Sequence, residues 1–135
     1  MLDWQPHAKS MTTGVLASHI ADIPNWVLAV IHQEEYNDLS GAPKFRGKSA
    51  EELVAQFDKN VAEALAAMQG FPDDKLFMPW TYKFDGHVVL TMPRVAVLRA
   101  FVLNHIIHHR AQLGVYFRLN DVLVPSSLGP SADES

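Results

Sequence analysis

The longest helix that the sequence predicts carries three histidines within five residues, at His105, His108 and His109. It begins near residues 91 and 92, has Pro93 in its first turn and runs to about residue 119. At 100° per residue, His105 and His109 lie about 40° apart on the apolar face, and His108 lies about 60° from His105, nearer the edge. Imidazole is only moderately tolerant of burial and has no special helix propensity, so two inward rings require a partner. The same face also holds Leu98, Phe101, Val102, Leu113 and Tyr116.

Two earlier segments have helical periodicity and can cover this face. Between residues 12 and about 36, apolar side chains recur at three- and four-residue spacing, and Pro24 predicts a kink because it lacks a backbone N–H. A second helix begins at Ser49, with Glu52 three residues later as a capping box, and ends at Gly70, a left-handed terminator. The intervening segment NDLSGAPKFRGK is turn-rich and predicts a loop.

Between the second and third helices the pattern changes to that of a β-hairpin. The segments WTYKF and HVVL flank Asp85-Gly86, the commonest type of two-residue hairpin turn. At 135 residues the chain fits one domain, residues 1–135, with a sizeable hydrophobic core. The predicted fold is therefore an all-α bundle of three long helices, with a short β-hairpin or extended insertion before the last helix.

Composition excludes several functional classes. The chain has no cysteine, so a metal ion would be held by His, Asp or Glu. The net charge is −4 with neutral histidines, and the basic residues are scattered, which argues against binding of nucleic acid. We see neither a membrane-spanning run nor a basic leader, and therefore expect a cytoplasmic protein without membrane contacts.

A third inward histidine comes from the first predicted helix, where His19 lies at the centre of the apolar stripe. The pair His105 and His109 alone favours two satisfied histidines, one of them at the edge of the core and hydrogen-bonded to a carbonyl group, because such spacing often arises by chance. Adding His19 favours a metal ion, because three imidazoles supply the protein ligands of an open, catalytic type of site. Each buried polar group left without a partner would cost about 1–3 kcal/mol, which a shared metal removes. The remaining histidines are expected in solvent: His7, His32 and His87.

The segment NHIIHHRAQLGVYFRLNDVLVPSSLGPSADE resembles the C-terminal signature of the DinB/YfiT-like metalloprotein family, NHxxHHRxQLxxYxRxxGxxVPxxYGPSADE. The segment TTGVLASHIADIPNW resembles the first ligand-bearing helix of that family, so the resemblance covers nearly the whole chain. It implies a DinB-like bundle in which His19, His105 and His109 bind one metal ion and His108 does not.

One departure from the family pattern bears on assembly. Family members normally have a helix before the one that carries His19, and this chain begins too late to contain it. Without that helix, an apolar groove is left along the helix that carries His19. Either the chain is truncated or this groove is filled from elsewhere. We expect a homodimer, in which a partner's helix or its N-terminal segment, residues 1–10 with Trp4 as anchor, covers the groove.

A divalent metal held by three neutral imidazoles keeps an open coordination position, which suits hydrolysis or activation of a thiol. Zinc and nickel are the expected metals, and cobalt and iron also fit the ligand set. The resemblance implies a thiol-dependent S-transferase or isomerase that uses bacillithiol, mycothiol or glutathione, and hence a low-molecular-weight thiol and an electrophile as ligands. The alternatives are a stress-related protein with a structural metal and a metal-free interaction bundle.

The sequence offers no obvious catalytic base. The candidates Asp22 and Gln112 flank the histidine face and Tyr116 lies one or two turns further on, and each is as well suited to orienting a ligand or filling the core. Arg110 points away from the ligands and is predicted to pair with an acidic residue of the tail, Asp133 or Glu134.

Overall fold

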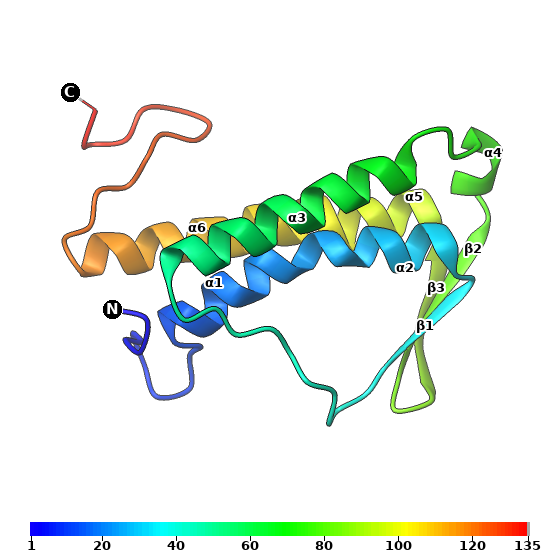
Figure 1. The fold of residues 1–135 in the computed structure, drawn as a ribbon, viewed down its shortest axis with the longest axis horizontal. Helices are drawn as coiled ribbons and strands as arrows, with labels where there is room; N and C mark the ends of the chain where they lie inside the picture. Colours follow the sequence, from blue (N-terminus) through cyan, green and yellow to red (C-terminus); the bar gives the residue numbers. More distant parts are fainter. Residues whose placement is uncertain (135) are drawn as a thin grey trace.

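The computed structural model describes residues 1–134 as three long helical segments with a small sheet at one end (Figure 1). The first segment comprises α1 (Thr13–Asp22), the 3₁₀ turn η1 (Ile23–Asn25) and α2 (Trp26–His32), and the second is α3 (Ala50–Met68). The third comprises α5 (Arg94–Val97), the π-helix η2 (Leu98–Asn104) and α6 (His105–Leu119). The sheet is formed by β1 (Glu35–Asp38), β2 (Pro79–Phe84) and β3 (His87–Pro93), and α4 (Asp73–Leu76) is a short helix before β2. The fold is therefore mostly helical rather than purely all-α, and the predicted β insertion is a three-stranded sheet rather than a hairpin alone.

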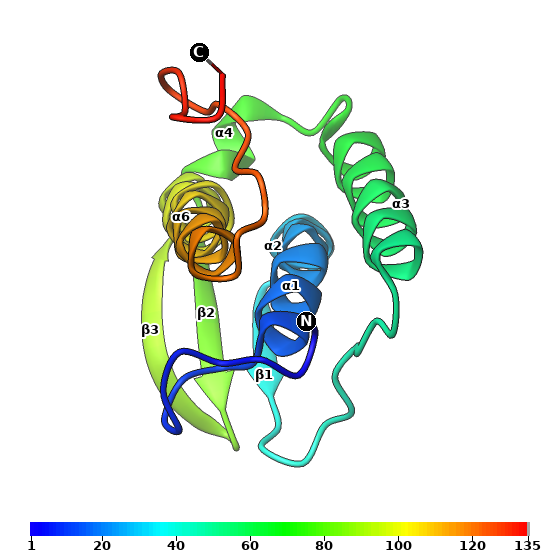
Figure 2. The ribbon, with the colours of Figure 1, turned by 90° about the vertical axis from the view of Figure 1, so that its left-hand side faces the viewer.

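The first helical segment lies between the other two, because α1 packs against α3 on one side and against α6 on the other (Figure 2). It begins where the Thr12 hydroxyl accepts a hydrogen bond from the Val15 N–H at 3.3 Å. At Pro24 the backbone makes a 3₁₀ turn and then continues as α2, which agrees with the predicted kink. The segment ends at His32 rather than near residue 36, because residues 35–38 pair with β2 instead.

The same segment is the apolar centre of the molecule. By length and composition Thr13–His32 would be able to cross a membrane, with a mean hydropathy of 1.4, but 56% of that window is buried inside the fold. Its residues Ile23, Val27 and Val30 belong to the main core, together with Val97 from α5. The sequence analysis saw no run that could span a membrane, whereas this one passes the test of length and composition; its burial between α3 and α6 accounts for its apolar character.

Helix α3 is bounded as the sequence predicts. The Ser49 hydroxyl accepts a hydrogen bond from the Glu52 N–H at 3.2 Å, while the Glu52 carboxylate accepts one from the Lys48 N–H. Gly70 follows the helix with φ of +73°, the left-handed conformation that glycine adopts at no steric cost. The buried Asn60 amide donates to the Ala21 carbonyl at 2.8 Å, which ties α3 to α1.

The predicted hairpin is present, with Asp85 and Gly86 at φ of +46° and +81° between β2 and β3. A third strand, β1, adds in parallel to β2 from a segment that was predicted as the end of a helix and the start of a loop. Strand β3 also extends further than expected, since Thr91 and Met92 pair with β2, so the last helix begins at Arg94 rather than at residues 91–92.

The sheet is fixed to the helices by two side chains. Trp80 is only 1% exposed, and its indole N–H donates to the Ala29 carbonyl at 3.3 Å. The Arg94 guanidinium donates to the carbonyls of Val30 and Gln33, which lie at the end of α2. These bonds hold β1 and β2 beside α2, at the end of the molecule where the aromatic side chains gather.

Both ends of the chain pack against α6. The Trp4 ring contacts the Tyr116 ring edge-on at 5.4 Å, and the Trp4 carbonyl accepts hydrogen bonds from Thr13. In the tail, Asp133 accepts two hydrogen bonds from the Arg118 guanidinium, at 2.9 and 2.8 Å. The prediction that Arg110 pairs with the tail is therefore wrong, because Arg118 lies in the last turn of α6, where the chain folds back.

Candidate metal centre

Three histidine side chains converge between α1 and α6. His19 comes from α1, and His105 and His109 lie one turn apart on α6. Their candidate ligand atoms all lie within 4.8 Å of one another, and the Nε2 atoms of His19 and His105 are 3.1 Å apart. The three ring centroids are 4.7–4.9 Å from one another. The structure thus brings together the three residues that the sequence singled out.

The π-helix η2 orients the ring of His105. The backbone N–H of His105 bonds to the Val102 carbonyl rather than to that of Phe101, four residues back, as a regular α-helix would require. The Phe101 carbonyl accepts instead from Nδ1 of His105, at 3.3 Å. Because a carbonyl can only accept, Nδ1 carries the proton, and the lone pair is on Nε2, which faces the cluster.

Gln112 orients the ring of His109 in the same way. Its Oε1 accepts a hydrogen bond from Nδ1 of His109 at 2.7 Å, three residues along the same helix. This leaves the Nε2 lone pair of His109 free, and a hydrogen bond of this kind also raises the basicity of a ligating imidazole. Of the three candidate catalytic residues, Gln112 is therefore the one in direct contact with the cluster.

The donor set fits a divalent ion of the zinc type. Tetrahedral coordination with bonds of about 2.0–2.1 Å separates the nitrogens by about 3.3 Å, close to the observed spacing of His19 and His105. In the metal-free protein one of these two facing nitrogens donates to the other, so His19, whose tautomer is not fixed by a carbonyl, carries that proton on Nε2. No Asp or Glu within residues 1–134 joins this cluster.

Burial keeps the imidazoles neutral. Desolvation is the largest cause that lowers the pKa of His19, to about 4, followed by repulsion from His105, His109 and Lys44. Desolvation also lowers the pKa of His105, with a further contribution from His109, against the opposing hydrogen bond to Phe101. At neutral pH both rings are in the form that binds metal.

The other residues considered from sequence lie apart from the centre. Tyr116 donates to the Met11 carbonyl and packs on Trp4, so it stabilises the N-terminal segment rather than the cluster. His108 is exposed and only touches the outer side of the His109 ring, with centroids 4.8 Å apart. Asp22 accepts from the Asn25 amide at 2.8 Å and borders a cleft next to His19. His7, His32 and His87 are also exposed, as expected.

This cleft, which we call the aromatic cleft, opens directly beside the histidines and has a volume of about 330 Å³. His19 and His105 lie in its wall. Apart from them its lining is formed by aromatic, charged and small loop side chains: Asp22, Trp26, Tyr36, Asp38, Ala42, Pro43, Lys44, Tyr82 and Phe101. The sequence analysis missed most of these residues, because they come from α2, β1, β2, η2 and the loop after β1, and no local pattern links them.

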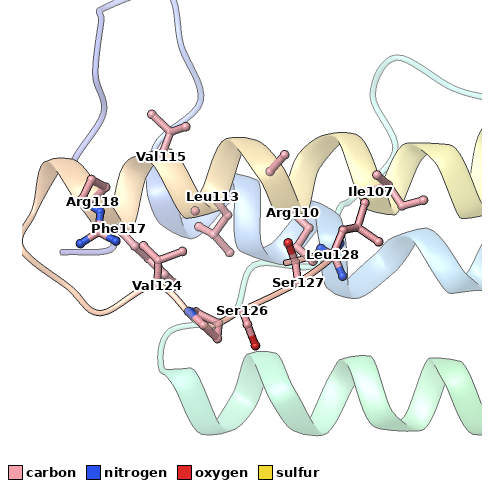
Figure 3. Close-up of a pocket in the computed structure, with 13 residues that line it drawn as sticks. Ile107, Arg110, Leu113, Val115, Phe117, Arg118, Val124, Ser126, Ser127 and Leu128 are labelled. Atoms are coloured by element: carbon pink, nitrogen blue, oxygen red, sulfur yellow. The ribbon is translucent and has the colours of Figure 1, made fainter. Parts of the chain in front are cut away.

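A larger cavity, of about 450 Å³, lies elsewhere, between α6 and the tail (Figure 3). It is bordered by Ile107, Arg110 and Leu113 on the helix and by Val124 and Leu128 on the tail. None of the three clustered histidines lines it, so its size does not make it the candidate active site.

Comparisons with known proteins agree with this architecture. The family model of the DinB superfamily matches residues 1–113. The fold is similar to that of a DinB-like protein from Bacillus cereus ATCC 10987, with a TM-score of 0.70 and 24% identity, over 93% of this chain and 79% of that chain. It is also similar to a DinB-like protein, YjoA, from Bacillus subtilis, with a TM-score of 0.65 and 18% identity, over 99% and 81% of the two chains. No curated protein matches the sequence.

Proposed function

Because this chain belongs to the DinB superfamily, we propose that it is a divalent-metal-dependent enzyme that transfers a low-molecular-weight thiol to an electrophile, with zinc or nickel as the metal. The observation that carries the proposal is the convergence of His19, His105 and His109 on one point beside a cleft. Hydrolysis at the same centre is the alternative reaction. We further propose that the protein works in the cytoplasm.

The ligand set favours a catalytic over a structural metal. A metal ion at such a site supplies positive charge and an open position, which lower the pKa of a bound thiol or water and polarise a carbonyl. A structural site would be closed by a fourth protein ligand, and no Asp or Glu in the described part of the chain lies in the cluster. The open side instead borders the aromatic cleft, through His19 and His105.

The chain's own residues prepare this centre. The Phe101 carbonyl and the Gln112 amide hold His105 and His109 with their Nε2 atoms facing inward, so that little reorganisation is needed on metal binding. The half-buried aromatic side chains of the cleft, such as Trp26 and Phe101, limit access of water to that side. The arrangement is suited to a small substrate that enters through the cleft.

We also propose that the protein is a homodimer whose partner covers the outer faces of α3 and of the continuous segment formed by η2 and α6. Several large apolar side chains are exposed there: Val54, Leu65, Met68, Leu103, Ile107, Val115 and Leu119. Residues 94–119 contain four arginines and no acidic residue, whereas α3 contains four acidic residues and one lysine. Packing α3 of one copy on α6 of the other would match these charges under two-fold symmetry. Trp4 packs within its own chain, so the partner's helices are the better candidates for this contact.

Metal content and thiol binding together test the function. Purified protein should contain close to one divalent metal ion per chain, and the double variant His105→Ala, His109→Ala should contain none. His108→Ala is the matched control and should retain the metal, because its ring is exposed. Equal metal loss from His108→Ala would contradict the assignment.

Calorimetry tests the second part of the proposal, which is that the metal-loaded protein binds a thiol. Binding of a thiol as its thiolate releases a proton, which titration in buffers of different ionisation enthalpy counts. If the metal-loaded protein bound none of the common cellular thiols and consumed none with a panel of electrophiles, a structural metal would be the better interpretation.

A further inference from the structure

The aromatic cleft has walls that suit a particular kind of ligand. We propose that it binds the positively charged amino group of a small molecule whose other end reaches the histidine cluster, so that the substrate or thiol is an amine. This inference rests on the proposed function, because it names the ligand class for the same site. It is carried by the rings and carboxylates around the cleft rather than by the histidines.

Three aromatic side chains of the cleft gather around a fourth, Trp26. Its ring centroid lies 5.2 Å from that of Tyr82, 5.7 Å from that of Tyr36 and 5.9 Å from that of Phe101. All four side chains are only half-buried, and all four line the cleft. Indole and phenol rings attract cations through the negative potential of their faces, most strongly where water is partly excluded.

Two carboxylates border the same space. Asp38, on β1, accepts a hydrogen bond from the Tyr82 hydroxyl at 3.4 Å, and Asp22 accepts one from Asn25. Each carboxylate has further lone pairs to offer to an ammonium group. Both carboxylates line the cleft together with Tyr36, and their charges add to the effect of burial, which is the larger cause that raises the pKa of Tyr36.

The one lysine that lines the cleft is Lys44, in the loop after β1. The wall thus combines aromatic rings and two carboxylates with the imidazoles of His19 and His105. A ligand with an ammonium group at one end and a metal-binding atom, such as a thiol sulfur, at the other matches both sets of groups.

The volume limits the size of such a ligand. A cleft of about 330 Å³ is at the lower end of the range for small-molecule sites, so it suits a compact amine rather than a long peptide. A ligand with a carboxylate where the ammonium is proposed would meet Asp22 and Asp38 and be rejected by like charge.

Two thiols that differ only in the amino group test the inference. Cysteamine and 2-mercaptoethanol both carry a thiol on a two-carbon chain, with an amine in the first and a hydroxyl in the second, and calorimetry on the metal-loaded protein should show that cysteamine binds about tenfold more tightly. Asp38→Asn should remove most of this preference, while Asp58→Asn, the matched change of an exposed acid on α3, should leave it intact. Equal affinities for the two thiols in the wild-type protein would overturn the inference.

A second measurement separates this inference from the proposed function. Choline has a quaternary ammonium and no thiol, and it should bind the metal-free protein weakly, with a loss of binding in Asp38→Asn. If the wild-type protein holds metal but binds choline no more tightly than the Asp38→Asn variant does, the proposed amine site is wrong and the metal site stands. If the protein holds no metal but binds choline in a manner that depends on Asp38, the amine site stands and the proposed reaction fails.

Discussion

The two faces of α6 differ in what covers them. On the inner face, His105 and His109 meet α1, and each ring has a hydrogen-bond partner within the chain. On the outer face, Ile107, Val115 and Leu119 are as apolar as a core, yet each is more than half exposed. The inner face is explained by this chain's own contacts, whereas on the outer face Ile107 and Val115 border the cavity beside the tail, and the proposed dimer would cover the apolar side chains that remain exposed.

This difference teaches that apolar periodicity alone does not say where the core is. Both faces contribute apolar side chains to the helix, and only the polar groups among them, two histidines and a glutamine, mark the side that is organised for chemistry. Where two faces of a helix are apolar, we expect one to serve the core and the other to serve a partner.

We expect the largest effect from a substitution that disrupts the proposed dimer and leaves the inner face of α6 intact. Leu103→Glu places a charge on the exposed outer face and should weaken the dimer about 100-fold or more, as changes at central interface positions do. Sedimentation equilibrium at micromolar concentration measures the dissociation constant directly.

Val89→Glu is the control for that experiment, because Val89 is an equally exposed apolar residue on β3, away from the proposed contact. A wild-type protein that is a monomer, with little dye binding to apolar surface, would show that the outer face needs no partner. The two faces would then differ only in how tightly their side chains pack within one chain.

A matched pair of valines compares the two faces directly. Val102 is 6% exposed and Val115 is 58% exposed, and both lie in the same continuous helical segment. Val102→Ala should lower the free energy of unfolding by about 1–2 kcal/mol through lost burial and a small cavity. Val115→Ala should change it by less than about 0.5 kcal/mol at concentrations where the protein is monomeric.

Urea denaturation at low and high protein concentration measures both effects. A Val115→Ala loss that appears only at high concentration would place that residue in the dimer contact and sharpen the contrast. An equal loss for both valines at low concentration would mean that the outer face is already covered within one chain.

The fold was predictable where a single residue constrains its own backbone. Pro24, Ser49, Gly70 and the Asp85-Gly86 turn each fix local geometry by a missing N–H, a capping hydroxyl or a positive φ, and all are found as expected. Strand β1 was missed because its sequence, EYND, has no strand periodicity. Its partner is β2, more than 40 residues later, so its pairing is decided by tertiary structure.

The candidate site was likewise predictable only where the geometry of a single helix decides the position of its residues. A helical wheel suffices to bring His105 and His109 to one face and to place Gln112 beside them, because α6 is a regular helix there. It cannot anticipate η2, which places the Phe101 carbonyl within hydrogen-bond distance of Nδ1 of His105, because the wheel assumes the α-helical repeat. Nor can it assemble Trp26, Tyr36 and Tyr82, which meet only after the sheet has docked on α2.

The smallest expected effect is a pH dependence of the metal-free protein, and its source is the inner face. The pKa values of His19 and His105 are lower in the folded state than the ordinary 6.5, that of His19 being about 4, mainly because burial disfavours the charged ring. The unfolded chain therefore binds more protons below pH 6.5, and the free energy of unfolding should fall as the pH decreases from about 6.5 toward 4. Because both rings are only half-buried, solvent screens much of this effect. Urea midpoints of chelator-treated protein between pH 7 and pH 5 measure it. His19→Phe should flatten the dependence, whereas His108→Ala, on the exposed side of the same helix as His105, should not. If His108→Ala flattened it as much, the contrast between the two faces would not arise from burial of the histidine cluster.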